Sequence, residues 1–199
     1  MVQLQMNHKT PYRPLRPLPP RTQKAAHSLA QAFLELCDDH EPTAFWLYTS
    51  FLTRFQVFHP ESTQLLDTTA TALTSLLNSH QKPLADHLAK LNVDLAVVCQ
   101  SWFQTLFAGV LPPDCLTGIY DVLIGGAPAI LAYTGLSLLL ACRRKLESTR
   151  SAKEVQDVLD KISNYVDVDA VARTAIDMWE RPILEGMPKE TRKMLGYNF

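Results

Sequence analysis

The chain has 199 residues, of which 47% are hydrophobic and 20% charged, and its formal net charge is −1 at pH 7. This composition is typical of a globular domain and excludes a disordered or fibrous chain. The near-neutral charge lacks the basic excess that nucleic-acid binders carry, so we expect no nucleic-acid partner.

Residues 1–21 form a proline-rich segment that we set apart from the rest of the chain. Five prolines fall within residues 10–20, where a fixed φ and missing N–H groups exclude regular helix or strand. Pro14, Pro17 and Pro20 have the PxxP spacing of an SH3 ligand, a pattern that is also common in linkers. Because the first residues lack the apolar core of a signal peptide, we expect a cytoplasmic protein.

Helical periodicity begins after the prolines and continues over most of the chain. Ala25, Leu29, Phe33 and Leu36 recur at intervals of four, four and three, which predicts a helix over residues 22–38. The same pattern, bounded by capping residues and prolines, predicts further helices that start near Glu41, Ser62, Pro83, Val98, Asp114 and Pro128, then one over 152–163 and one from Val168 that ends at Pro182. No segment alternates strictly, so we predict an all-α fold. It consists of an irregular helical bundle over residues 22–183 and a polar tail over 184–199.

The segment that follows Glu41 is rich in aromatic residues. One face of the predicted helix carries Phe45, Leu52 and Phe55, and the other faces carry Trp46, Tyr48 and Phe51. A helix that is apolar on several sides is normally buried on several sides. We therefore interpret this helix as a central one.

The uncharged stretch from Val122 to Cys142 has two interpretations. It is long enough to span a bilayer, and basic residues follow it directly, as the positive-inside rule would predict. Gly125, Gly126 and Pro128 interrupt it, however, and the remaining helix has the length of a buried core helix. We favour a buried core helix without an integral membrane span, and keep a membrane anchor as the alternative.

Cysteines and histidines form no recognisable catalytic or ligand set. The four cysteines are far apart and lie in apolar stretches, which indicates reduced, buried thiols. None of the six histidines forms an HxxxH pair, and the sequence has no GxSxG, Walker or GxGxxG motif. We therefore expect no metal, no cofactor and no hydrolase chemistry.

Residues 95–147 carry a specific pattern of aromatic and turn residues. The heptapeptide WFQTLFA at residues 102–108 is followed by an LP pair, an IYD triplet and a glycine. In order and spacing, this pattern resembles the C-terminal half of the TBC domain, the helical GTPase-activating module for Rab proteins. The residues that carry the resemblance are Trp102, Phe103, Phe107, Leu111, Pro112, Ile119, Tyr120, Asp121 and Gly125. Two positions depart from the family pattern, because its arginine is Gly118 here and its tryptophan is Tyr120.

Comparison with the catalytic motifs of the TBC family predicts a non-catalytic protein. TBC domains use an arginine finger in an IxxDxxR motif and a glutamine finger in a YxQ motif, which stabilise the transferred phosphoryl group and orient water. No IxxDxxR motif is present in this sequence. Gln5, in the sequence QLQMN, is the nearest equivalent of the glutamine finger, and a chance glutamine in a polar segment explains it equally well.

The sequence after the motif indicates which kind of TBC family member this chain resembles. The segment AIDMW, with Ala175, Ile176, Asp177 and Trp179, is similar to the end of a small TBC family member that is a subunit of the tuberous sclerosis complex. This similarity implies a subunit that binds the coiled-coil scaffold hamartin and helps to regulate Rheb and TOR signalling, with a small GTPase as a further partner. It also implies peripheral attachment to lysosomal or other endomembranes through partners. The alternative is a fragment or isoform of a Rab GTPase-activating protein.

Overall fold

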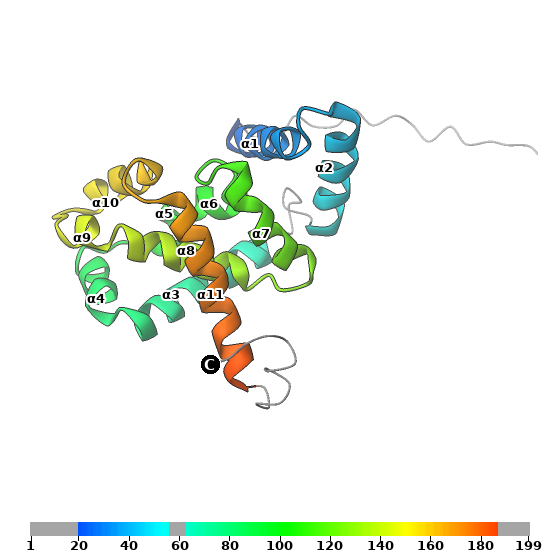
Figure 1. Cartoon of the computed structure of the whole chain (residues 1–199). Coiled ribbons are helices and arrows are strands. Elements are labelled where there is room, and N and C mark those ends of the chain that lie inside the picture. The colour runs from blue at the N-terminus through cyan, green and yellow to red at the C-terminus, as the bar shows by residue number, and fades with distance from the viewer. Residues whose placement is uncertain (1–19, 56–62, 187–199) are drawn as a thin grey trace, which may run out of the picture.

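The computed structural model describes residues 20–55 and 63–186, and every regular element within them is a helix (Figure 1). The predicted all-α fold is therefore confirmed. The elements are α1 (Pro20–Leu36), α2 (Glu41–Phe55), α3 (Thr63–His80), α4 (Lys82–Lys90), α5 (Leu95–Val98), α6 (Gln100–Gln104), α7 (Pro113–Ile124), α8 (Ile130–Ala141), α9 (Arg143–Glu147), α10 (Ala152–Leu159), the short 3-10 helix η1 (Ile162–Asn164) and α11 (Val168–Gly186).

α8 is the central helix of the bundle, with α3, α7 and α11 packed around it (Figure 1). Nine of its 12 residues are buried, which confirms the prediction of a buried core helix. Small residues permit the close approach of its neighbours. A Cβ atom on Gly135 would lie 3.2 Å from Leu73 Cδ2 of α3, and the Ser137 hydroxyl donates a buried hydrogen bond of 2.9 Å to the Val171 carbonyl of α11. Among the described residues, no helix combines the length and the apolar character needed to cross a membrane.

Residues named in the sequence analysis define several helix ends. The Ser151 hydroxyl accepts a hydrogen bond from the Glu154 N–H at 3.3 Å, and the Glu154 carboxylate accepts one from the Arg150 N–H at 2.8 Å. This is the predicted capping box at the start of α10, with the return bond shifted by one residue. At the end of α7, Gly126 has a φ of 101°, a left-handed conformation that glycine adopts readily.

The last two helices differ in length from the prediction. The helix expected over 152–163 ends at Leu159, and η1 follows it, although Ile162 faces the core as its spacing predicts. α11 continues through Pro182 to Gly186, so the predicted stop at Pro182 is wrong. A proline removes one N–H donor and kinks a helix, but the helix continues where the flanking hydrogen bonds remain.

The interpretation of α2 as a central helix is wrong. Its inward residues Ala44, Tyr48 and Phe51 pack against α1, while Phe45 and Trp46 on its outer face are exposed. In Figure 1 the helix stands at the edge of the bundle, next to α1 and away from α8. Aromatic content alone does not reveal burial, because an exposed apolar face has the same sequence signature as a buried one.

The end of α6 is an unexpected turn, because two bulky residues, Leu106 and Phe107, have φ values of 48° and 68°. The Leu106 N–H bonds to the Phe103 carbonyl and the Phe107 N–H to the Trp102 carbonyl, which is the Schellman arrangement. Leu106 and Phe107 are fully buried, and the Trp102 and Phe107 ring centroids lie 6.2 Å apart. The helix predicted to start near Val98 is therefore the short helix α6, which ends in this turn.

Tyr120 of α7 holds this turn in place from the opposite side. Its hydroxyl donates a hydrogen bond of 3.1 Å to the Leu106 carbonyl. Its ring centroid lies 5.9 Å from that of Phe33 in α1 and 5.2 Å from that of Phe51 in α2. Burial raises the pKa of this hydroxyl, so it stays protonated and remains a donor. One side chain thus connects α1, α2, α7 and the end of α6.

Replacing Tyr120 by phenylalanine is expected to destabilise the fold by about 1–2 kcal/mol, because the buried Leu106 carbonyl loses its donor while the ring contacts remain. Urea unfolding followed by circular dichroism measures the change. Tyr133→Phe is the matched control, since Tyr133 is a partly buried residue whose hydroxyl has no hydrogen bond to a described residue. Equal stability of the two variants would contradict the role assigned to the Tyr120 hydroxyl.

Candidate functional site

Most of the TBC-like motif lies in the hydrophobic core. Six of its nine residues are buried, namely Trp102, Phe103, Phe107, Leu111, Ile119 and Tyr120. The other three are exposed at or near helix ends. Pro112 precedes α7 and Gly125 ends it, while Asp121 makes no ion pair with any described residue. The motif therefore specifies how α6 and α7 pack, and its side chains do not converge on a cleft.

The AIDMW segment belongs to the same core. Ala175 is fully buried, and Ile176 and Trp179 are half-buried against the core, whereas Asp177 is exposed. α11, which carries the segment, lies across α8 in Figure 1 and also packs on α7. Gln5, the candidate remnant of the glutamine finger, lies outside the described residues, as do residues 1–19 of the proline-rich segment and 187–199 of the tail.

The cysteines of the core are protonated thiols. Burial raises the pKa of both Cys99 and Cys142 to about 12. Burial, and then the hydrogen bond of 3.0 Å that Cys115 Sγ donates to Asp169 Oδ1, raises the pKa of Cys115 to about 11. A thiol of this kind is a poor nucleophile and a poor metal ligand. In the described part of the chain, no group of three or more His, Cys, Asp or Glu side chains has the arrangement of a metal site.

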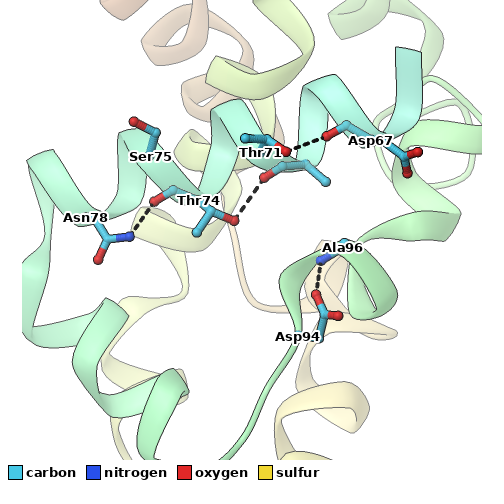
Figure 2. Close-up of a pocket in the computed structure, with 8 residues that line it drawn as sticks. Asp67, Thr71, Thr74, Ser75, Asn78, Asp94 and Ala96 are labelled. Carbon is cyan, nitrogen blue, oxygen red and sulfur yellow. Dashed lines mark hydrogen bonds between the residues drawn. The ribbon is translucent and has the colours of Figure 1, made fainter. Parts of the chain in front are cut away.

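A groove between α3 and the start of α5 encloses about 480 Å³ (Figure 2). Several of its polar side chains are already bonded within their own segments. Thr71 and Thr74 donate to the carbonyls of Asp67 and Ala70, and the Asp94 carboxylate caps α5 by accepting from the Ala96 N–H. These groups complete local helix structure, and among the polar side chains of the groove only Asp67 and Ser75 make no hydrogen bond with a described residue.

The exposed side of α2 is the most unusual surface of the described chain. Phe45, Trp46 and Leu47 are consecutive, and their relative exposures are 58%, 69% and 49%. The Phe45 and Trp46 rings contact each other with their centroids 5.7 Å apart. We call these three residues the α2 apolar surface. Exposed contiguous apolar side chains mark interaction sites in soluble proteins.

The spacing of apolar residues in the sequence of α2 could have predicted this exposed surface. Ala44, Tyr48, Phe51 and Phe55 follow a helical stripe at intervals of four, three and four, and together with Leu52 they face the bundle. Once one stripe is assigned to the core, Phe45 and Trp46 must lie outside it. The exposed position of α2 therefore follows from counting one face of the helix instead of all its apolar residues.

The family model of the Rab-GTPase-TBC domain matches residues 24–147, more than half of the chain. The chain belongs to this family. Among curated proteins it is similar to TBC1 domain family member 7 of Homo sapiens, with 26% identity over 181 residues that cover 91% of this chain and 59% of that protein. Its similarity to the Danio rerio protein of the same name is 30% over 183 residues, covering 91% of this chain and 60% of the relative. The chain thus spans about three fifths of the length of these relatives.

The TBC family model ends at residue 147, but the similarity to the relatives and the packing both continue beyond it. Gly118, which replaces the arginine of the family pattern, shows how the two parts fit. A Cβ atom at this position would lie 3.0 Å from Ile176 Cδ1 of α11, closer than an ordinary contact. α11 therefore approaches α7 at a distance that a side chain at position 118 would oppose.

This contact predicts coupling between positions 118 and 176. Replacing a glycine by alanine inside a helix normally stabilises it by up to about 1 kcal/mol. We expect Gly118→Ala to lose that gain in the wild-type background, and to recover it in an Ile176→Val background, because valine lacks the Cδ1 atom. A double-mutant cycle by urea unfolding should give a coupling energy of about 1 kcal/mol. Additive effects would show that α11 relaxes away from α7.

Proposed function

We propose that this chain is a non-catalytic TBC-like subunit that binds a coiled-coil scaffold of the hamartin type, in a tuberous sclerosis-type complex that regulates Rheb and TOR signalling. Family membership and the similarity to TBC1 domain family member 7 support this proposal, as does the AIDMW segment. A cytoplasmic location, with peripheral attachment to lysosomal or other endomembranes through the partners, belongs to the same proposal.

The α2 apolar surface is the observation that carries the proposal. A coiled-coil scaffold presents helices with apolar stripes, and such helices dock on exposed apolar surfaces of this kind. Because Phe45, Trp46 and Leu47 point away from the bundle, they contribute little to its stability and are free to contact a partner. Tryptophan in particular is enriched among the residues that dominate binding energy.

The non-catalytic part of the proposal rests on the chemistry of the side chains. An arginine finger is worth a factor of about 10³–10⁵ in GTP hydrolysis, and the 199 residues contain no IxxDxxR motif to supply one. Six of the nine motif residues pack in the core. The alternative, a fragment or isoform of a Rab GTPase-activating protein, is favoured by the description of the family itself.

Binding to the C-terminal coiled coil of hamartin tests the scaffold proposal. Isothermal titration calorimetry should detect a complex at micromolar concentration or below, and Trp46→Ala should weaken it by about 30-fold, the effect of losing a central aromatic contact. Val97→Ala and Ile124→Ala are matched controls, because both remove exposed apolar side chains of other helices. If the wild-type chain shows no binding at micromolar concentration, the subunit proposal is wrong.

Single-turnover GTP hydrolysis with a panel of Rab proteins tests the non-catalytic proposal. The expected result is the intrinsic rate of each Rab, because the transition-state charge on the phosphoryl group lacks an arginine partner. A Rab GTPase-activating protein with both fingers serves as the positive control. Acceleration of any Rab by more than about tenfold would favour the activating-fragment alternative.

A further inference from the structure

We propose that the α2 apolar surface binds a partner helix whose apolar stripe is flanked by lysine or arginine residues, which pair with an acidic cluster at the start of α2. We define the α2 acidic cluster as Asp38, Asp39 and Glu41. The inference rests on the docking surface of the proposed function. It adds the charge of the partner helix and its direction relative to α2.

The outer face of α2 is suited to an apolar helix. Beyond Phe45, the next residues on that face are Thr49 and Thr53, whose hydroxyls donate hydrogen bonds of 2.8 Å to the Phe45 and Thr49 carbonyls. These hydroxyls are therefore already satisfied, and the threonine methyl groups extend the apolar surface along the helix. A partner helix meets no unpaired hydroxyl along the line from Phe45 to Thr53, and beside it only the exposed Ser50 hydroxyl makes no hydrogen bond with a described residue.

The charge on this part of the molecule is one-sided. Between Lys24 and Arg54 the chain contains four acidic residues, Glu35 and the α2 acidic cluster, and neither lysine nor arginine. With histidines neutral, that stretch carries a formal charge of −4, whereas the whole chain carries −1. The carboxylates are exposed, and none forms an ion pair with a described residue.

The acidic cluster adjoins the apolar surface. Glu41 lies four residues before Phe45, so the two side chains occupy the same helix face one turn apart. Asp38 and Asp39 form the turn before α2, and both have left-handed backbone conformations, with φ values of 51° and 58°. Their N–H groups bond to the Glu35 and Leu34 carbonyls, which fixes the turn against α1 and holds both aspartates at the start of α2.

Arg54 places a positive charge at the end of α2 opposite the acidic cluster. It is exposed in the last turn of α2, 13 residues after Glu41, so the two ends of the helix carry opposite charge roughly 20 Å apart. A partner helix that lies along α2 gains most when its basic residues face the acidic cluster and an acidic residue faces Arg54. This arrangement fixes the direction of the partner helix relative to α2.

A second copy of this chain fits the surface less well. The opposing copy would bring only Arg54 to the acidic end, because no other lysine or arginine lies between Lys24 and Arg54. The three apolar side chains also expose only roughly 400 Å² together, from the usual areas of such side chains. A stable interface between globular proteins buries about 800 Å² per partner. One helix with complementary charges suits this area better.

Two designed helical peptides test the inference directly. They share one leucine stripe, and one carries lysines where the other carries glutamates, next to the residues that would face the start of α2. We expect the lysine peptide to bind the full chain at least tenfold more tightly at about 0.05 M salt, and the preference to shrink at about 0.5 M salt as the charges are screened. Fluorescence anisotropy measures both affinities.

Neutral variants of the chain locate the effect. Asp38→Asn/Asp39→Asn/Glu41→Gln removes three negative charges, and asparagine tolerates the left-handed conformation at both aspartate positions. It should abolish the preference for the lysine peptide. Asp121→Asn/Asp157→Asn/Asp177→Asn is the matched control, with the same change in net charge on three other helices, and should keep the preference. Thermal unfolding of both variants checks that the fold is intact.

The outcomes separate this inference from the proposed function. Equal binding of the two peptides, or loss of preference in the control variant, would overturn the charge assignment even if the hamartin coiled coil binds. A dimer in sedimentation equilibrium that Trp46→Ala dissociates would assign the surface to a second copy and overturn the inference too. A charge preference without hamartin binding would support the surface and its polarity while removing the scaffold proposal.

Discussion

The hydrogen bond from the Tyr120 hydroxyl to the Leu106 carbonyl is the constraint on which this half of the bundle depends. Leu106 ends α6 in a left-handed conformation that a leucine adopts only when its surroundings compensate the strain. The compensation comes from full burial and from Tyr120, whose ring also contacts Phe33 and Phe51. α2, with the apolar surface that it carries, packs mainly on α1, and the Tyr120 ring of α7 contacts both helices through Phe33 and Phe51.

The TBC-like motif consists mainly of residues that pack the hydrophobic core. Its aromatic residues fill the space between α6, α7 and the helices around them, so core packing accounts for their order and spacing. The segment after residue 147 takes part in the same packing, since α11 covers α8 and meets Gly118 through Ile176. The core therefore includes α11, and its packing extends beyond the residues that the family model covers.

Local chemistry made the helices predictable, and tertiary contacts decided the rest. The stripe from Ala25 to Leu36, the capping box at Ser151 and the Gly125–Gly126 pair each have a cause within a few residues, so the sequence alone indicates them. The left-handed turn at Leu106 and the peripheral place of α2 depend on residues far away in the chain, among them Tyr120. The exposed face of α2 can be predicted only when one apolar stripe is assigned to the core. The position of the acidic cluster beside that face follows only from the position of α2 in the fold.

The position of α11 in the chain has a consequence for synthesis. α8 is the most buried helix, and its partner α11 is the last helix of the described chain to leave the ribosome. Until residues 168–186 emerge, the face of α8 that receives them stays open to water, and the Ser137 hydroxyl has no Val171 carbonyl to bond. Nascent chains with such a delayed closing contact are held by chaperones or aggregate. The core is therefore completed only after α11 has emerged and packed on α8.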